Sequence, residues 1–339
     1  MARDAPLIAD LKRNALDDGP GIRSVVFFKG CPLRCVWCQN PECLSPAPQL
    51  QPLPERCTGC GACVPACPIG AARPLASPAA RPLAAPSPCR ACGACVAACP
   101  AAARRIVGRA WPPGALVEHL LRDRPFYDAS GGGVTLSGGE ATLHLGFAAD
   151  LARRLAAHGV HVLLETCGWF DGERFERELL PHLGAVYFDL KLADPADHLR
   201  FAGRDNERIL GNLARLSRTA PERLLVRVPL VPGITDTNAN LRALADIVRV
   251  LGLPRVALLP YNPLWLPKRR ALGLDMPYDH GAWMSAGDVE ACAEVFRAAG
   301  LDVDGVRDGM ESRAEPQSRR GGREGTSAHS GRGEGQGGT

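Results

Sequence analysis

The sequence contains no apolar run long enough to cross a bilayer, and its first residues lack the apolar segment of a secretion signal. It also lacks an excess of charge, since 40 basic and 36 acidic side chains give a net charge of only +4. Proteins that bind polyanions carry a basic stripe, which this balance does not provide. We therefore expect neither a membrane segment nor a nucleic-acid partner.

Cysteine, in contrast, is abundant and unevenly placed. Twelve of the 14 cysteines lie between Cys31 and Cys99, and eleven of these fall into three tight runs. Neighbours two residues apart within one turn suit metal ligation better than disulfide bonds. Together with the missing secretion signal, this pattern predicts a protein of the reducing cytoplasm.

The first run consists of Cys31, Cys35 and Cys38 and follows a strand candidate directly. Three thiolates at this spacing can hold three irons of a 4Fe-4S cluster and leave the fourth iron without a protein ligand. An iron with an open position can bind and activate a small molecule, so this run predicts chemistry. A zinc site or a disulfide is the alternative, and Cys43 could then be the fourth zinc ligand.

The other two runs are copies of one pattern. Residues 57–68 and 89–100 begin 32 residues apart, and each holds four cysteines followed by a proline. Bacterial ferredoxins have this pattern, and in them the fourth cysteine of each run ligates the cluster of the other run. One 4Fe-4S cluster would take Cys57, Cys60, Cys63 and Cys99, and a second would take Cys89, Cys92, Cys95 and Cys67. Eight structural zinc ligands are the alternative, although zinc sites pair their cysteines across longer loops.

The rest of the chain alternates strand-like and helix-like segments. Strands are predicted over 24–29, 133–136, 160–164, 185–190, 224–231 and 255–259, and helices over 145–158, 205–219, 238–251 and 286–299. Gly159, Gly252 and Gly300 follow three of these helices as stops. About six βα units predict an α/β protein with a partial (β/α)6, TIM-like barrel, whose site lies at the C-terminal strand ends.

Composition divides the chain further. We expect residues 1–43 and 109–311 to form the barrel, and residues 44–108, rich in Pro, Ala and Cys, to form an inserted ferredoxin-like domain. Residues 312–339 are Gly, Arg, Ser and Glu with hardly any apolar side chain, which predicts a disordered tail.

Five motifs in order carry a resemblance to a known family. The Cys31–Cys38 run looks like the cluster motif of radical S-adenosylmethionine (SAM) enzymes. More narrowly, the set resembles the glycyl-radical enzyme activating enzymes, in the subtype with two extra clusters, over roughly residues 7–300. The motifs are Asp18-Gly-Pro-Gly-Ile-Arg23, Gly30–Asn40, Ser130–Glu140, Asp189-Leu-Lys191 and Val231-Pro-Gly233.

The resemblance implies that Cys31, Cys35 and Cys38 are catalytic and hold the cluster that binds SAM. The positions that it assigns to SAM binding are Trp37, Asn40, Gly138, Gly139, Glu140, Glu165, Asp189, Lys191 and Asn240, with Arg227 a weaker candidate. The Gly138–Glu140 segment would bind the amino group of SAM, and Lys191 its carboxylate. Glu165 stands where family members often have Asp.

Ordinary structural roles remain open for several of these residues. Trp37 could pack in the core, Lys191 could be a solvated charge, and Asn240 could cap a helix. Lys191 is one of only four lysines in an arginine-rich chain, which favours a specific role for its compact ammonium group. Cys167 has no partner at ligand spacing and is expected to be a small buried residue.

The function that the resemblance implies is that of a radical SAM oxidoreductase. A 5′-deoxyadenosyl radical made from SAM would abstract a hydrogen atom from a backbone glycine of a partner glycyl-radical enzyme. The Asp18–Arg23 segment of this chain would help to hold the partner's glycine loop. Three 4Fe-4S clusters, SAM and a flavodoxin or ferredoxin-type electron donor would be required. The alternatives are a radical SAM enzyme acting on a small molecule or RNA, and a non-catalytic electron-transfer protein.

Overall fold

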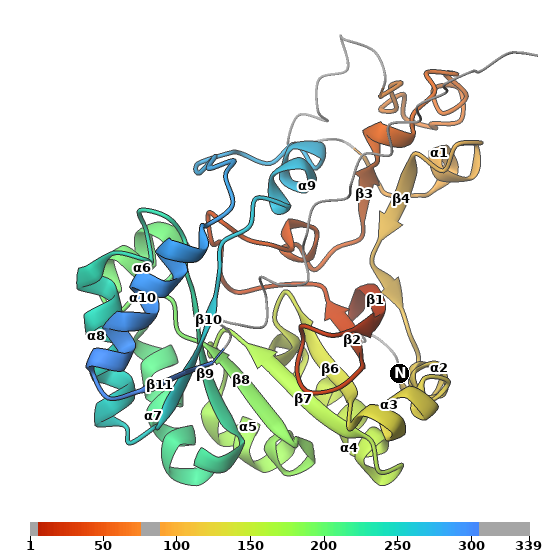
Figure 1. Ribbon diagram of the computed structural model, residues 1–339. Coiled ribbons are helices and arrows are strands. Elements are labelled where there is room, and N and C mark those ends of the chain that lie inside the picture. The colour runs from red at the N-terminus through yellow and green to blue at the C-terminus, as the bar shows by residue number, and fades with distance from the viewer. Residues whose placement is uncertain (1–5, 76–88, 305–339) are drawn as a thin grey trace, which may run out of the picture.

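A computed structural model describes residues 6–75 and 89–304. Its main sheet has nine strands in the order β11-β10-β9-β8-β7-β6-β2-β1-β5. Every neighbouring pair from β2 to β11 is parallel, whereas β1 pairs antiparallel with both β2 and β5. Because the parallel strands follow one another in chain order, the sheet is wound in one direction, as in a barrel left open (Figure 1).

The six predicted strands agree closely with β2 (Arg23–Phe28), β6 (Gly133–Gly138), β7 (His161–Thr166), β8 (Ala185–Asp189), β9 (Leu224–Pro229) and β10 (Arg255–Leu259), and β10 agrees to the residue. The sheet also contains three strands that were not predicted, β1 (Leu7–Ala15), β5 (Arg109–Ala110) and β11 (Asp302–Asp304). The strands β2 and β6 to β10 provide the six βα units, so the chain forms a partial (β/α)6 barrel.

Helices cover the outer face of the sheet. They are α2 (Pro113–Leu121), α3 (Arg124–Ser130), α4 (Leu145–Ala157), α5 (Gly172–Glu178), α6 (Pro195–Ala202), α7 (Glu207–Thr219), α8 (Asn238–Val250) and α10 (Ala286–Ala298). A further helix, α9 (Trp265–Ala271), instead packs against Pro41–Cys43. In α7, Ile209, Leu213 and Leu216 are buried at helical spacing and face the barrel. None of the helices in the described ranges is both long and apolar enough to cross a membrane.

The glycine stops were predicted correctly. Gly159, Gly252 and Gly300 have φ angles of 73°, 70° and 83°, in the left-handed region that other residues avoid. Each of the three follows a helix and turns the chain back toward the next strand. The strand β1, in contrast, was not predicted, because its Asp10-Leu-Lys-Arg-Asn14 stretch is polar and carries bulges.

Residues 44–108 contribute a second, two-stranded sheet of β3 (Gln49–Pro52) and β4 (Arg104–Val107). This sheet leads away from the barrel to the cysteine runs and the short helix α1 (Ala94–Ala97) (Figure 1). Leu50, Cys63, Ala72 and Cys95 form a small core of their own there. The remaining short 3-10 turns are η1 (Pro41–Cys43), η2 (Pro54–Arg56), η3 (Ala141–His144), η4 (Leu180–His182) and η5 (Pro221–Arg223). The tail predicted over 312–339 lies outside the described residues.

Candidate active site

A cavity of about 390 Å³ opens at the C-terminal ends of the parallel strands. The three cysteines of the first run, Cys31, Cys35 and Cys38, line it. Eight of the residues predicted for SAM binding also line it: Trp37, Asn40, Gly138, Gly139, Glu165, Asp189, Lys191 and the weaker candidate Arg227. These residues come from different strands, so the barrel brings together motifs that are far apart in the sequence.

The cysteine loop is fastened to α6 by its backbone. Arg34 N donates to Ala202 O at 2.7 Å, and Val36 N donates to Phe201 O at 3.0 Å. Within the described residues, no group of three or more His, Cys, Asp or Glu side chains is placed to hold a metal ion. Each cysteine of a cubic cluster binds a different iron, so cysteines of that kind need not converge on one point.

Burial decides the protonation of two of these thiols. It raises the pKa of Cys35 and of Cys38 to about 12. The pKa of Cys31 is lowered, because the thiol of Cys167 hydrogen-bonds to it and outweighs burial. Metal ligation requires thiolates, so loading of this site must release protons. Cys167, expected to be only a small buried residue, lies in the cavity wall and touches a cysteine of the run.

Cys43 is the one cysteine near the first run that the sequence offers as a fourth ligand. It is 1% exposed and does not line the cavity. Its carbonyl accepts a hydrogen bond from Gly30 N at 2.7 Å, and burial raises the pKa of its thiol. These contacts place Cys43 in the packing behind the cysteine loop.

Two glycines at the end of β6 let the cysteine loop come close. A Cβ on Gly138 would lie 2.3 Å from Phe28 N, and one on Gly139 would lie 2.2 Å from Gly30 O. Both distances are shorter than any real contact, so only glycine fits at these positions. Gly138 also has a φ of 106°, which a side chain would strain.

Glu140 follows these glycines but is bonded internally. Its carboxylate accepts hydrogen bonds from Thr142 Oγ1 at 2.7 Å, Thr166 Oγ1 at 3.0 Å and Cys167 N at 2.7 Å. It is 1% exposed and does not line the cavity. In this structure Glu140 joins the end of β6 to the end of β7, and the glycine backbone beside it faces the cavity.

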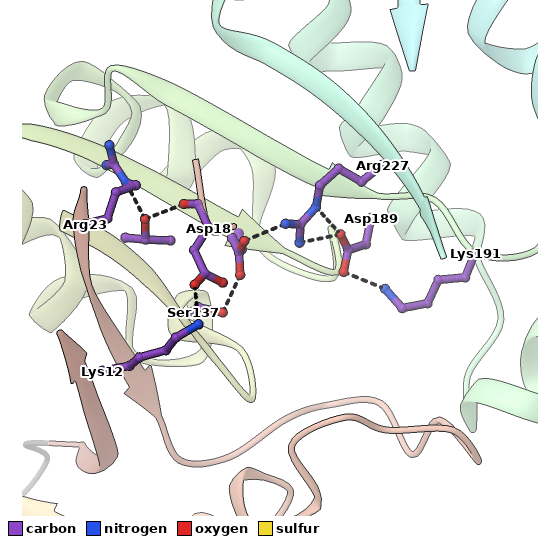
Figure 2. A network of polar contacts seen from close by, with 9 residues as sticks. Lys12, Asp18, Arg23, Ser137, Asp189, Lys191 and Arg227 are labelled. Atoms are coloured by element: carbon purple, nitrogen blue, oxygen red, sulfur yellow. Dashed lines mark hydrogen bonds and ion pairs between the residues drawn. The ribbon is translucent and has the colours of Figure 1, made fainter. Parts of the chain in front are cut away.

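Strand ends β7, β8 and β9 carry a buried charge network (Figure 2). Arg227 Nη2 contacts Asp189 Oδ1 at 2.8 Å, and its Nη1 pairs with Glu165. Lys191 Nζ lies 3.2 Å from Asp189 Oδ2, and Ser137 Oγ donates to Glu165 at 2.6 Å. The cavity floor is therefore polar and its charges are matched.

The charges in this network hold one another ionised. Burial disfavours the charged form of Lys191, but Asp189 and the nearby cysteines together outweigh it and raise its pKa. Burial likewise disfavours the Asp189 carboxylate, and Arg227 and Lys191 outweigh it, so the pKa of Asp189 is lowered. Lys191 thus presents a buried ammonium group to the cavity, which a ligand carboxylate can reach.

Asn240 lies outside the cavity and serves the loops around it. Its Oδ1 accepts from Ala193 N at 2.9 Å, while its Nδ2 donates to Lys191 O at 3.1 Å and Thr235 O at 2.8 Å. The N-cap of α8 is Thr237. Asn240 is therefore not the helix cap, and it fixes the backbone of Lys191 from the first turn of α8.

The Asp18–Arg23 segment is held by hydrogen bonds to Thr135 of β6. Arg23 is fully buried and donates to Thr135 Oγ1 at 2.7 Å, and Thr135 in turn donates to Asp18 O at 2.8 Å (Figure 2). Asp18 pairs with Lys12 at 3.0 Å and lines the cavity. Arg23 is thus a structural residue, whereas Asp18 reaches the site.

A second, smaller cavity of about 150 Å³ lies among the cysteines of residues 44–108. It is lined by Cys67 from the first copy together with Cys89, Cys92 and Cys95 from the second. Cys60 and Cys92 are exposed, while Cys57 and Cys99 are half-buried. The fourth cysteine of one run therefore lies with the first three of the other.

The fold and the cavity define a class before any relative is considered. A partial barrel whose first strand leads into a three-cysteine loop at the mouth of a polar cavity is a radical SAM architecture. Residues 50–100 match the model of a 4Fe-4S dicluster domain.

Curated relatives define the family. The trans-4-hydroxy-L-proline dehydratase activating enzyme of Clostridioides difficile is 40% identical over 260 residues, 76% of this chain and 84% of the relative. The choline trimethylamine-lyase activating enzyme of Oleidesulfovibrio alaskensis is 35% identical over 91% of this chain and its own full length. A solved domain of the pyruvate-formate lyase-activating enzyme of Bacteroides vulgatus is 26% identical, with a TM-score of 0.41 over 51% of this chain and 97% of that domain.

The chain belongs to the glycyl-radical enzyme activating enzymes. It is a radical SAM oxidoreductase that uses SAM and 4Fe-4S clusters.

Proposed function

We propose that this protein abstracts a hydrogen atom from a backbone glycine of its partner enzyme at the cavity of about 390 Å³. The observation that carries the proposal is the meeting of Cys31, Cys35 and Cys38 with the buried Lys191 in that one cavity. The cysteines supply an incomplete ligand set, and the ammonium group supplies a counter-charge for the carboxylate of an amino acid.

The residues present fit a cluster and SAM. Cavities for ligands of this size measure about 300 to 1,000 Å³, and this one lies in that range. Gly138 and Gly139 line its wall with backbone atoms alone, and backbone carbonyls can accept hydrogen bonds from an ammonium group. Cys31, Cys35 and Cys38 would hold the cluster, which in its reduced form would supply the one electron needed to cleave SAM into methionine and a 5′-deoxyadenosyl radical.

The chain itself binds, orients and shields. Lys191 binds the SAM carboxylate, and the backbone of the Gly138–Glu140 segment binds its amino group. Trp37, 4% exposed, forms an apolar wall for the adenine, and Asn40 also lines the cavity. Glu165 and Asp189 keep Arg227 and Lys191 fixed, so little reorganisation is needed when SAM binds. Asn240 acts indirectly, through the backbone of Lys191.

The partner's glycine loop enters at the mouth of the cavity. Asp18 reaches the cavity from the Asp18–Arg23 segment and contacts that loop. Closure of the mouth by the partner keeps water away from the radical.

Residues 44–108 form a separate electron-transfer domain with two further clusters, which brings the total to three. The smaller cavity is lined by Cys67, Cys89, Cys92 and Cys95. This supports the crossed ligand assignment for one of the two clusters. The other cluster takes Cys57, Cys60, Cys63 and Cys99. A flavodoxin or ferredoxin-type donor supplies the electrons. The barrel then consists of residues 1–43 and 109–311.

An anaerobic assay tests the proposal. The reconstituted protein is reduced in the presence of SAM and should release 5′-deoxyadenosine, and addition of a partner should give a glycyl radical in its EPR spectrum. Absence of 5′-deoxyadenosine would contradict the enzyme reading. Release of 5′-deoxyadenosine without a radical on any plausible partner would favour a small-molecule substrate.

A further inference from the structure

Buried polar atoms without a hydrogen-bond partner are rare in the described part of the chain. Only two side-chain atoms are of this kind, Glu42 Oε2 and Arg269 Nη1. Arg269 is 9% exposed. A buried guanidinium N–H without an acceptor costs free energy, so an orphan of this kind needs an explanation.

Helix α9, which carries Arg269, packs against the segment that follows Cys38. Lys268 Nζ lies 2.9 Å from Glu42 Oε1 and 3.4 Å from Asn40 Oδ1. Just before α9 in the chain, Asn262 O accepts a hydrogen bond from Gln39 Nε2 at 3.2 Å. Asn40 and Asn262 both line the cavity, so α9 is fixed directly behind the cysteine loop.

The charge of Arg269 has no carboxylate partner in the described ranges. Its Nε donates to the backbone carbonyl of Asp275, which orients the guanidinium. Burial lowers the pKa of Arg269, and Cys38, Asp275 and Cys35 oppose this effect, the two cysteines only as the thiolates that they become when they ligate iron. Helix α9 thus holds a positive charge behind the segment that follows Cys38, with one N–H left over.

We propose that Arg269 donates its free Nη1–H to a sulfur of the cluster at Cys31, Cys35 and Cys38, and thereby raises the reduction potential of that cluster. This inference rests on the proposed site for the catalytic cluster. A thiolate-ligated cluster gains negative charge on reduction, and hydrogen bonds to its sulfurs and nearby positive charge stabilise the reduced state. Arg269 would make the electron easier to deliver without touching SAM.

Potentiometry tests this inference on the whole protein. The quantity is the midpoint potential of the EPR component that changes when SAM is added, since only a cluster with an open iron responds to SAM. Arg269→Gln removes the charge and should lower the one-electron reduction equilibrium constant about tenfold, a shift of about 59 mV. Arg269→Lys keeps the charge but loses the planar fork, and about threefold is expected.

Arg270→Gln is the matched control. Arg270 is the next residue of α9, but it is exposed and pairs with Asp279 at 2.6 Å. Its replacement should leave the potential unchanged, while any general damage to α9 would appear in both variants.

The outcomes test the role of Arg269 and the proposed cluster site separately. An unchanged potential in both Arg269 variants would overturn the role of Arg269, and a fall in thermal stability alone would show that it only holds the Asp275 carbonyl. If Arg269→Gln does not fold, Arg269→Lys decides the question by the same measurement. Absence of any SAM-responsive signal in the unaltered protein would instead contradict the proposed site.

Discussion

The barrel and residues 44–108 both present closely spaced cysteines, but they surround them differently. Burial raises the pKa of Cys35 and Cys38 to about 12 at the barrel mouth. In the second region burial also raises the pKa of Cys95, but backbone N–H groups, first that of Ile69, lower the pKa of Cys67. The cavities differ as well, at about 390 Å³ and about 150 Å³.

This difference shows how one type of ligand serves two purposes. The larger cavity leaves room beside three cysteines for a substrate and lines it with matched charges. The smaller one contains four cysteines and apolar side chains such as Leu50 and Ile106, with no space for a further ligand of SAM size. Under the proposed function, space and charge around the sulfurs, more than the sulfurs themselves, would separate catalysis from electron transfer.

The largest expected effect comes from exchanging a cysteine in either region. Cys35→Ala should remove about four irons and abolish SAM cleavage, because the catalytic cluster loses a ligand. Cys92→Ala should also remove about four irons, yet SAM cleavage should persist with a chemical reductant. Iron analysis and 5′-deoxyadenosine release measure both. Loss of cleavage in Cys92→Ala under chemical reduction would erase the distinction between the two regions.

Lys191→Ala should weaken SAM binding strongly while leaving all the irons in place. A lost charge-assisted contact in a buried site costs about 2 to 3 kcal/mol, or about 30- to 150-fold in Kd. Lys191→Arg serves as the control that keeps the charge. Equilibrium binding of SAM to the reconstituted protein gives the answer, and an unchanged affinity in Lys191→Ala would remove Lys191 from the site.

Gly139→Ala should damage only the barrel site. Its Cβ would meet Gly30 O at 2.2 Å, so the cysteine loop must shift, at a cost of about 1 to 3 kcal/mol in unfolding free energy. The control is Gly146→Ala in α4, where nothing lies within 4 Å and a gain of about 0.5 to 1 kcal/mol is expected. Denaturant unfolding compares the two variants. Equal stabilities would refute the close approach.

The smallest effect is expected for Cys43→Ala. Cys43 lies behind the cysteine loop and outside the cavity, so iron content and SAM cleavage should match those of the unaltered protein. The lost sulfur should cost only about 1 kcal/mol in stability, as for a small buried apolar group. A loss of about four irons would identify Cys43 as a fourth ligand of the first cluster.

Much of this organisation could be predicted from local pattern. The strand 255–259 and the stops at Gly159, Gly252 and Gly300 follow from apolar runs and backbone freedom, which are properties of neighbouring residues. The strand β1 could not be predicted in this way, because its polar stretch acquires strand structure only by pairing with β2 and β5. Pairing of that kind depends on residues far away in the chain.

The grouping and spacing of the cysteines, and the polar residues that end the strands, could be read from the amino-acid sequence alone. Which of those side chains face the cavity depends on how the strands and loops pack. Glu140 and Asn240 lie outside the cavity and form hydrogen bonds with neighbouring loops, because buried polar groups must find partners. Cys167 and Arg269 belong to no motif, and the fold brings Cys167 to Cys31 from the end of β7 and packs α9, which carries Arg269, against the segment that follows Cys38.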